Sequence, residues 1–203
     1  MAYKTFISQS LIYRMAIQAG LRKEELLTFP ESYIEDPRTK RGSSTVRILL
    51  NPKDMMTKGS REREVDLPMA LYERLWQYKI HERNQLLVEN EAPARKELFL
   101  NRFGKAYSIK GSILNSELKK ITGRKAISLH VLRHTYATFK LYGLRSNPNY
   151  RGEPLVYIQD RLGHSSIETT KIYLHYIESL EGDFMTEYDQ DIDKICLEAE
   201  SDA

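Results

Sequence analysis

The sequence contains little cysteine and no long apolar run, and each absence excludes a class of protein. Its 203 residues include a single cysteine, Cys196, so no intramolecular disulfide can form. No apolar run approaches the ~18 residues of a membrane-spanning helix, and the N-terminal MAYKTFISQS lacks the apolar core of a signal peptide. Internal repeats and low-complexity segments are also absent from the sequence. We therefore expect a soluble, cytoplasmic protein without a membrane partner.

Charge is distributed unevenly along the sequence. The chain has 31 basic and 28 acidic side chains, but residues 181–203 hold nine of the acids and only one base, Lys194. The residues before that tail hold 30 bases and 19 acids. A basic body followed by an acidic tail favours a polyanionic partner, although a solvated surface of mixed charge would give the same totals.

Hydrophobic periodicity predicts a mostly helical α+β fold with a small antiparallel sheet near the N-terminus. Strands are expected at residues 44–50 and 61–68, joined by the turn NPKDMMTKGS, with a short extended piece at 97–101. Helices are expected at residues 8–20, 21–29, 68–90, 108–121, 128–143, 155–163 and 165–180. Serine side chains are expected to cap the starts of three of these helices, at Ser108, Ser128 and either Ser165 or Ser166. Glycines are expected to end three of them, at Gly20, Gly143 and Gly163.

The stretch SLHVLRHTYAT, residues 128–138, places His130, Arg133 and His134 on one turn of a helix. A metal site is disfavoured, because the Glu of H-E-x-x-H is missing, no C-x-x-C pair exists and a guanidinium repels a cation. We therefore predict no metal and no cofactor. For His134 and His175 the pattern favours an ordinary structural role, as core or surface residues that form hydrogen bonds. His130 and Arg133 are suited to donate hydrogen bonds together to one phosphate.

Further motifs extend this pattern along the chain. In RLGHSSIETTKIYLHY, His164 follows Gly163, and Tyr173 comes nine residues later on the next helix. H-x-x-R, L-G-H and this tyrosine, in that order, resemble the tyrosine recombinase (phage integrase) family. AGLRKEELL and TKGSREREVDLP are similar to the family's first arginine motif and its β-hairpin lysine motif. The resemblance covers residues 10–180 and implies a six-residue active set: Arg22, Lys58, His130, Arg133, His164 and Tyr173.

The resemblance implies a reaction that uses neither metal nor ATP. Tyr173 would attack a DNA phosphate and form a 3′-phosphotyrosyl link, while Arg22 and Arg133 bind the non-bridging oxygens. Tyr176, on the same helix, is the rival nucleophile, and spacing from the L-G-H motif favours Tyr173. Glu25, three residues after Arg22, is expected to support that arginine or the fold.

Three more roles concern protons and the phosphate. Lys58 would protonate the 5′ oxygen as it leaves, with Lys53, Arg61 and Arg63 as alternatives close in sequence. His130 would assist proton transfer to or from the tyrosine, and His164 would donate a hydrogen bond to the phosphate.

The implied partner is double-stranded DNA, bound by a homo-oligomer, a tetramer in the family, with no small-molecule substrate. The implied function is a site-specific recombinase or integrase in a prokaryotic cytoplasm or nucleoid. A type IB topoisomerase or a telomere resolvase would share the tyrosine chemistry. An inactive DNA-binding relative would need neither Tyr173 nor Lys58.

Three features depart from the family. Residues 143–154 form a longer loop that carries Arg145 and Arg151. The catalytic motifs begin near residue 20, so residues 1–180 are expected to form the catalytic domain without an N-terminal core-binding domain. The acidic tail, residues 181–203, is expected to dock on a neighbouring protomer or fold back on its own domain. Its apolar stripe consists of Phe184, Tyr188, Ile192 and Ile195.

Overall fold

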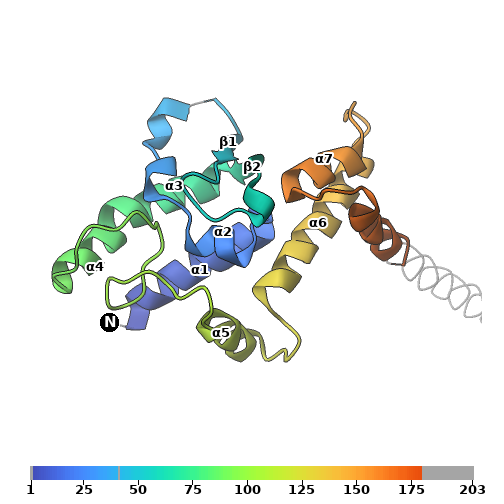
Figure 1. The fold of residues 1–203 in the computed structure, drawn as a ribbon. Helices are drawn as coiled ribbons and strands as arrows, with labels where there is room; N and C mark the ends of the chain where they lie inside the picture. Colours follow the sequence, from blue (N-terminus) through green and yellow to red (C-terminus); the bar gives the residue numbers. More distant parts are fainter. Residues whose placement is uncertain (1, 41, 180–203) are drawn as a thin grey trace, which may run out of the picture. The chain divides into compact units, whose positions relative to one another are not determined.

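The computed structural model describes residues 2–40 and 42–179, and the predictions for the acidic tail lie outside these residues. The chain is mostly helical with one two-stranded antiparallel sheet, so the predicted fold class is confirmed (Figure 1). The helices and strands are α1 (Ala2–Ala19), α2 (Lys23–Leu27), β1 (Thr45–Leu50), β2 (Arg63–Pro68), α3 (Met69–Tyr78), α4 (Asn84–Glu89), α5 (Ile113–Thr122), α6 (Leu129–Arg145) and α7 (Pro154–Leu162). Short 3-10 turns lie at η1 (Glu31–Tyr33), η2 (Pro37–Lys40) and η3 (Lys58–Ser60), and a last helix begins at residue 168.

The hairpin forms because apolar residues alternate along both strands. Val46 lies opposite Leu67 and Ile48 opposite Val65, and all four side chains are buried on one face. α1 packs against β2 and α3, and α3 packs against both strands, so the sheet and these two helices enclose the core of this part of the chain (Figure 1). The short extended piece predicted at 97–101 is present, and it forms two isolated bridges, at Glu97 and Leu100.

The long helix predicted at 68–90 is present but is not uniform. Between α3 and α4, residues Lys79–Arg83 form a π-helical turn, η4. The buried Arg83 at its end donates hydrogen bonds from Nε to Glu97 O at 3.1 Å and from Nη2 to Arg95 O at 2.5 Å. A widened turn of this kind leaves no signature in hydrophobic spacing.

Several predicted helix ends are confirmed and two are wrong. Ser128 Oγ accepts a hydrogen bond from Val131 N at 3.3 Å, Ser166 Oγ accepts one from Glu168 N at 3.2 Å, and Gly163 ends α7 with φ +60°. α5 begins at Ile113, because Ser108 instead forms a turn in which its carbonyl accepts a hydrogen bond from Gly111 N.

Gly143 does not end α6, which continues to Arg145. A Cβ at this glycine would meet nothing within 4 Å, and its φ is negative. The prediction failed because a glycine stops a helix only where its backbone turns left-handed, and here it stays helical.

The described residues form two compact units. The first contains residues up to 137 together with 160–163, and its core is built from α1, α2, the hairpin and α3. The second contains residues 138–159 and 164–179, with Leu141, Ile158, Tyr173 and Ile177 buried. Within the described residues, no helix has the length and apolar character needed to cross a membrane.

Candidate active site

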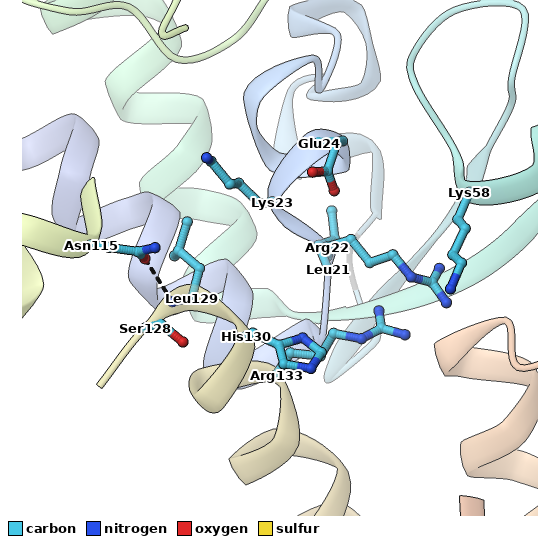
Figure 2. A pocket seen from close by; sticks show the side chains of 10 residues that line it. All are labelled: Leu21, Arg22, Lys23, Glu24, Lys58, Asn115, Ser128, Leu129, His130 and Arg133. Carbon is cyan, nitrogen blue, oxygen red and sulfur yellow. Dashed lines mark hydrogen bonds between the residues drawn. The ribbon is translucent and has the colours of Figure 1, made fainter. Parts of the chain in front are cut away.

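Four of the six predicted site residues line one cavity of the first unit. The cavity has a volume of about 380 Å³ and is bounded by the start of α2, the η3 turn of the hairpin, α5 and the start of α6. In Figure 2 the ends of Arg22, Lys58 and Arg133 are directed to the same region, with the His130 ring beside Arg133. The lining residues are Leu21, Arg22, Lys23, Glu24, Lys58, Asn115, Ser128, Leu129, His130 and Arg133. Four cationic side chains against a single carboxylate make this a site for an anion.

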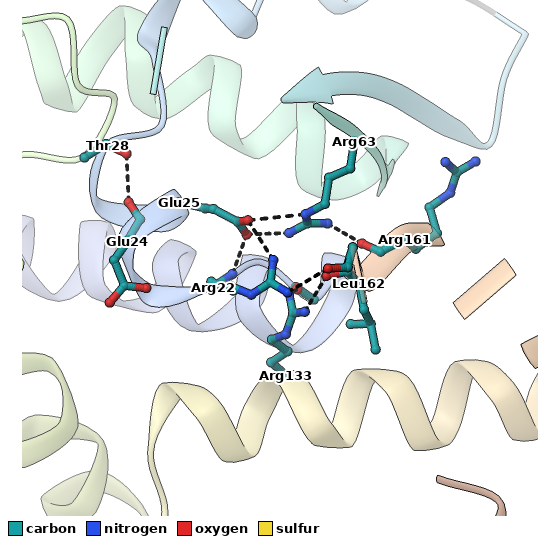
Figure 3. A network of polar contacts seen from close by, with 10 residues as sticks. Arg22, Glu24, Glu25, Thr28, Arg63, Arg133, Arg161 and Leu162 are labelled. Atoms are coloured by element: carbon teal, nitrogen blue, oxygen red, sulfur yellow. Dashed lines mark hydrogen bonds and ion pairs between the residues drawn. The ribbon is translucent and has the colours of Figure 1, made fainter. Parts of the chain in front are cut away.

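The three arginines next to the cavity share one anchor, the C-terminal end of α7. Arg63 donates to the carbonyl oxygen of Arg161, and Arg133 Nη2 donates to that of Leu162 at 2.6 Å (Figure 3). Arg22 Nη2 donates to the carbonyl oxygen of Gly163 at 3.2 Å. The last carbonyls of a helix have no partner within the helix and carry the negative end of its dipole. Guanidinium groups complement both, so the helix end fixes where the arginines point.

Arg133 is buried, with 3% of its surface exposed, and is held by a second carbonyl as well. Its Nη1 donates to the backbone oxygen of Gly20, which lies two residues before Arg22. A Cβ at Gly20 would lie 2.3 Å from the Tyr136 ring, and φ there is +66°, so only glycine fits this approach. The two arginines are therefore positioned relative to each other through backbone atoms.

Glu25 organises Arg22 and Arg63. Its carboxylate accepts hydrogen bonds from Arg22 N at 2.7 Å, Arg22 Nη1 at 3.2 Å and Arg63 Nε at 3.2 Å, and it forms an ion pair with Arg63 Nη2 (Figure 3). Burial alone would raise the pKa of the Glu25 carboxyl, but the Arg63 guanidinium and the Arg22 groups outweigh it and hold that pKa below its ordinary value. Glu25 is therefore an ionised support for the arginines.

Arg161 supplies a further link within the first unit. Its Nε donates to Asp66 Oδ2 at 2.8 Å and its Nη1 to Glu64 Oε2 at 3.0 Å. Both carboxylates belong to β2, so this side chain joins the end of α7 to the hairpin that carries Lys58.

Lys58 is an exposed member of the cavity lining. It lies in η3, between the strands, and is exposed, with no hydrogen bond or ion pair to another described residue. Of the alternatives close in sequence, Arg63 is occupied by Glu25, and neither Lys53 nor Arg61 lines the cavity. A lysine in this position can approach a ligand that enters the cavity.

His130 and His134 interact one turn apart on α6. Their Nε2 atoms lie 2.8 Å apart, and the ring planes meet at 84°. Burial lowers the pKa of the His134 imidazole, and His130 and Arg133 lower it further. His134 is thus a hydrogen-bonding residue in this structure. No group of three His, Cys, Asp or Glu side chains within the described residues could hold a metal ion.

His164 and Tyr173 lie together in the second unit. Their rings stack with centroids 6.4 Å apart and an interplanar angle of 13°. His164 Nδ1 lies 3.0 Å from Thr170 Oγ1, and its backbone N donates to Gln159 O. Tyr173 is 1% exposed, whereas Tyr176 on the same helix is 52% exposed. These contacts define a paired histidine and tyrosine, with the rival tyrosine facing outward.

Two cavity residues were missed by the sequence analysis. Lys23 lines the cavity and donates from Nζ to Gly111 O at 2.9 Å. Asn115 accepts a hydrogen bond at Oδ1 from Leu129 N at 3.0 Å, at the start of α6. Lys23 directly follows Arg22 in the sequence, and this position could have predicted that it lines the cavity. Asn115 acts through a contact between two helices, which sequence spacing does not show.

The chain is similar in sequence to known proteins of one family. The sequence pattern of the phage integrase family matches residues 2–179. The chain is 34% identical over 136 residues to the tyrosine recombinase XerD of Staphylococcus epidermidis, covering 66% of this chain and 42% of that protein. It is 30% identical over 158 residues to the tyrosine recombinase XerC of Lacticaseibacillus casei, covering 73% of this chain and 50% of that one.

The fold is similar to a solved structure as well. The XerH site-specific recombinase, in its post-cleavage complex with a palindromic difH substrate, matches with a TM-score of 0.62 and 22% identity, over 93% of this chain and 48% of that one. The chain spans about half the length, or less, of these relatives.

Proposed function

Because the chain belongs to the phage integrase family of tyrosine recombinases, we propose that it is the catalytic part of an enzyme that cuts and rejoins DNA. In this proposal the enzyme is a site-specific recombinase that acts on double-stranded DNA through a 3′-phosphotyrosyl intermediate. It works in a bacterial cytoplasm as a homo-oligomer, a tetramer on DNA. The catalytic domain comprises residues 1–180, followed by the acidic tail.

One observation carries the proposal: two arginines, a lysine and a histidine from three segments of the chain line one cavity, and the arginines are fixed by backbone carbonyls. The transition state of phosphoryl transfer concentrates negative charge on the non-bridging oxygens. Preorganised donors aimed at such charge contribute about 10²–10³ in rate for each donor. Arg22 and Arg133 have this role in the proposal.

Tyr173 is the proposed nucleophile. A phenol with an ordinary pKa of ~10 is a weak nucleophile at neutral pH, so it needs a proton acceptor and a stabilised phosphate. His130 assists the transfer of that proton, His164 donates a hydrogen bond to the phosphate, and Lys58 protonates the departing 5′ oxygen. The bond between Tyr173 and the 3′ phosphate keeps the strand end activated, so rejoining requires no ATP.

A covalent-trapping assay tests the function. The chain is incubated with supercoiled plasmid in EDTA and quenched with SDS, and protein–DNA adducts and relaxed plasmid are measured. We expect adducts with the wild type and with Tyr176→Phe, and none with Tyr173→Phe. Loss of adducts in Tyr176→Phe alone would move the nucleophile to that residue. DNA binding without adducts in any variant would support an inactive DNA-binding relative.

A second arm separates recombination from simple relaxation. Plasmids that carry one or two copies of the site mapped from the adducts are compared. We expect two-site plasmids to give exchanged or deleted products. Relaxation of both plasmids without exchange would instead support a topoisomerase.

A further inference from the structure

The contact between His130 and His134 limits where protons can reside on the two rings. A distance of 2.8 Å between two ring nitrogens is a hydrogen bond, in which one nitrogen carries the proton and the other accepts it. If both neutral rings carried a proton on Nε2, two donors would face each other. If neither did, two lone pairs would face each other. When both rings are neutral, one of them must therefore be the Nδ1–H tautomer.

The two histidines differ in accessibility. His130 is exposed and lines the cavity, whereas His134 is half-buried and does not line it. Within the described residues, the only hydrogen bond of His130 through its ring is the one to His134. Since that bond uses Nε2, Nδ1 is the ring nitrogen of His130 left for a ligand.

We propose that His134 is a positioning residue for His130. His134 binds Nε2 of the His130 ring, so that Nδ1 of His130 is the nitrogen that exchanges a proton in the cavity. The proposal rests on the proposed function, in which His130 moves the proton of the attacking tyrosine. The proton then joins Nδ1 of His130 while its Nε2–H remains donated to the neutral His134 ring. An orienting partner on the far nitrogen is the arrangement by which a third residue fixes a catalytic histidine.

The surrounding charge keeps the pair from taking up two protons. Burial lowers the pKa of His134, and His130 and Arg133 lower it further, which disfavours a charge on that ring. The charged groups that line the cavity around His130 are Arg22, Lys23, Lys58 and Arg133, with the single carboxylate Glu24. A second positive charge on the pair would be repelled by these cations.

Two substitutions separate positioning from packing. His134→Gln keeps a polar group that can reach Nε2 of His130, whereas His134→Leu keeps comparable bulk and removes the hydrogen bond. His81→Gln is the matched control, because His81 is exposed and lies outside the cavity. Thermal unfolding of each variant shows whether it folds.

The first measurement needs no DNA and no activity. Long-range ¹H–¹⁵N correlation spectra report which nitrogen of each histidine carries the proton, at a pH about two units above the ordinary histidine pKa of ~6.5. We expect His134 to be the Nδ1–H tautomer and His130 the Nε2–H tautomer in the wild type, with His130→Gln and His134→Gln used for assignment. Two Nε2–H rings, or an Nδ1–H tautomer at His130, would overturn the proposal whatever the chain does to DNA.

The second measurement is the pH profile of adduct formation in the trapping assay. We expect His134→Leu to form adducts about tenfold more slowly than the wild type and to show a displaced pH profile, and His134→Gln to recover most of the rate. A folded His134→Leu variant with wild-type rate and profile would overturn the proposal. Equal losses in both variants with an unchanged profile would assign His134 to packing alone. Failure of the proposed function itself would appear separately, as adducts that survive Tyr173→Phe or never form.

Discussion

Arg133 donates one hydrogen bond to the carbonyl oxygen of Gly20 and another to that of Leu162. The first acceptor lies just before Arg22, and the second lies at the end of α7. One buried guanidinium thus connects the start of α6, the turn between α1 and α2, and the L-G-H segment. A substitution that shifts either of these backbone carbonyls is expected to disturb the cavity, even where the substituted residue touches no ligand.

Gly163→Ala tests this connection. Gly163 has φ +60°, and a Cβ there would lie 2.7 Å from Arg63 Cδ, so both the backbone and the arginine would have to shift. We expect the free energy of unfolding to fall by about 1–2 kcal/mol and adduct formation to slow. Urea denaturation and the trapping assay measure the two effects.

Gly143→Ala is the control for that substitution. Gly143 lies inside α6, and a Cβ there meets nothing within 4 Å. Alanine should raise stability by about 0.5–1 kcal/mol, because glycine loses more conformational freedom in a helix. If both substitutions destabilised the protein equally, the contact at Gly163 would not explain the effect.

The elements that could be predicted from the sequence are those with local causes. Apolar alternation predicted the hairpin, and Ser128, Ser166 and Gly163 marked helix ends. Each of these signals depends on contacts between residues that are close in sequence. Gly143 and Ser108 were misleading because the same residue types also occur where no helix end is formed.

The site could be predicted in part because its residues carry recognisable spacing. Arg22, Lys58, His130 and Arg133 were predicted from motifs and line one cavity. The supports of this cavity were not predictable: Arg63 is bound by Glu25, 38 positions earlier in the chain, and the carbonyls of α7 are reached only after folding. A backbone acceptor can belong to any residue type, so it leaves no trace in sequence.

Glu25→Gln is expected to be strongly destabilising. Glu25 and Arg63 have side chains 1% and 6% exposed, so removing one charge leaves the other buried without its counterion. Breaking such a pair costs about 3–5 kcal/mol. Glu24→Gln, at the exposed neighbouring position, should change stability by less than about 0.5 kcal/mol. Chemical denaturation of both variants measures the free energy of unfolding. A loss at Glu25→Gln as small as that at Glu24→Gln would show that the ion pair adds little to stability.

The same carboxylate predicts how stability depends on pH. The folded pKa of Glu25 lies below its ordinary value, so its contribution is complete above an unfolded pKa of ~4.3 and is lost as the pH falls through the folded value. The stability difference between the wild type and Glu25→Gln should therefore be constant near neutral pH and shrink on acidification below ~4.3. Urea titrations at a series of pH values measure this difference. A gap that widened on acidification would mean that the folded pKa is raised.

Lys58→Ala tests the assignment of the general acid. Without a proton donor for the departing 5′ oxygen, cleavage should slow by about 10²-fold or more. A DNA strand with sulfur at the 5′ bridging position does not need that proton, because a thiol with a pKa of ~8.5 leaves readily as its anion. On sulfur-containing DNA with the site mapped from plasmid adducts, Lys58→Ala should therefore cleave at close to the wild-type rate.

Two control variants separate this role from others. Arg133→Ala should stay slow on both substrates, since Arg133 stabilises the phosphate and not the leaving group. Lys53→Ala, at an exposed position outside the cavity, should behave as the wild type on both. If sulfur rescued Lys53→Ala but not Lys58→Ala, the proton donor would be Lys53, and Lys58 would not protonate the leaving oxygen.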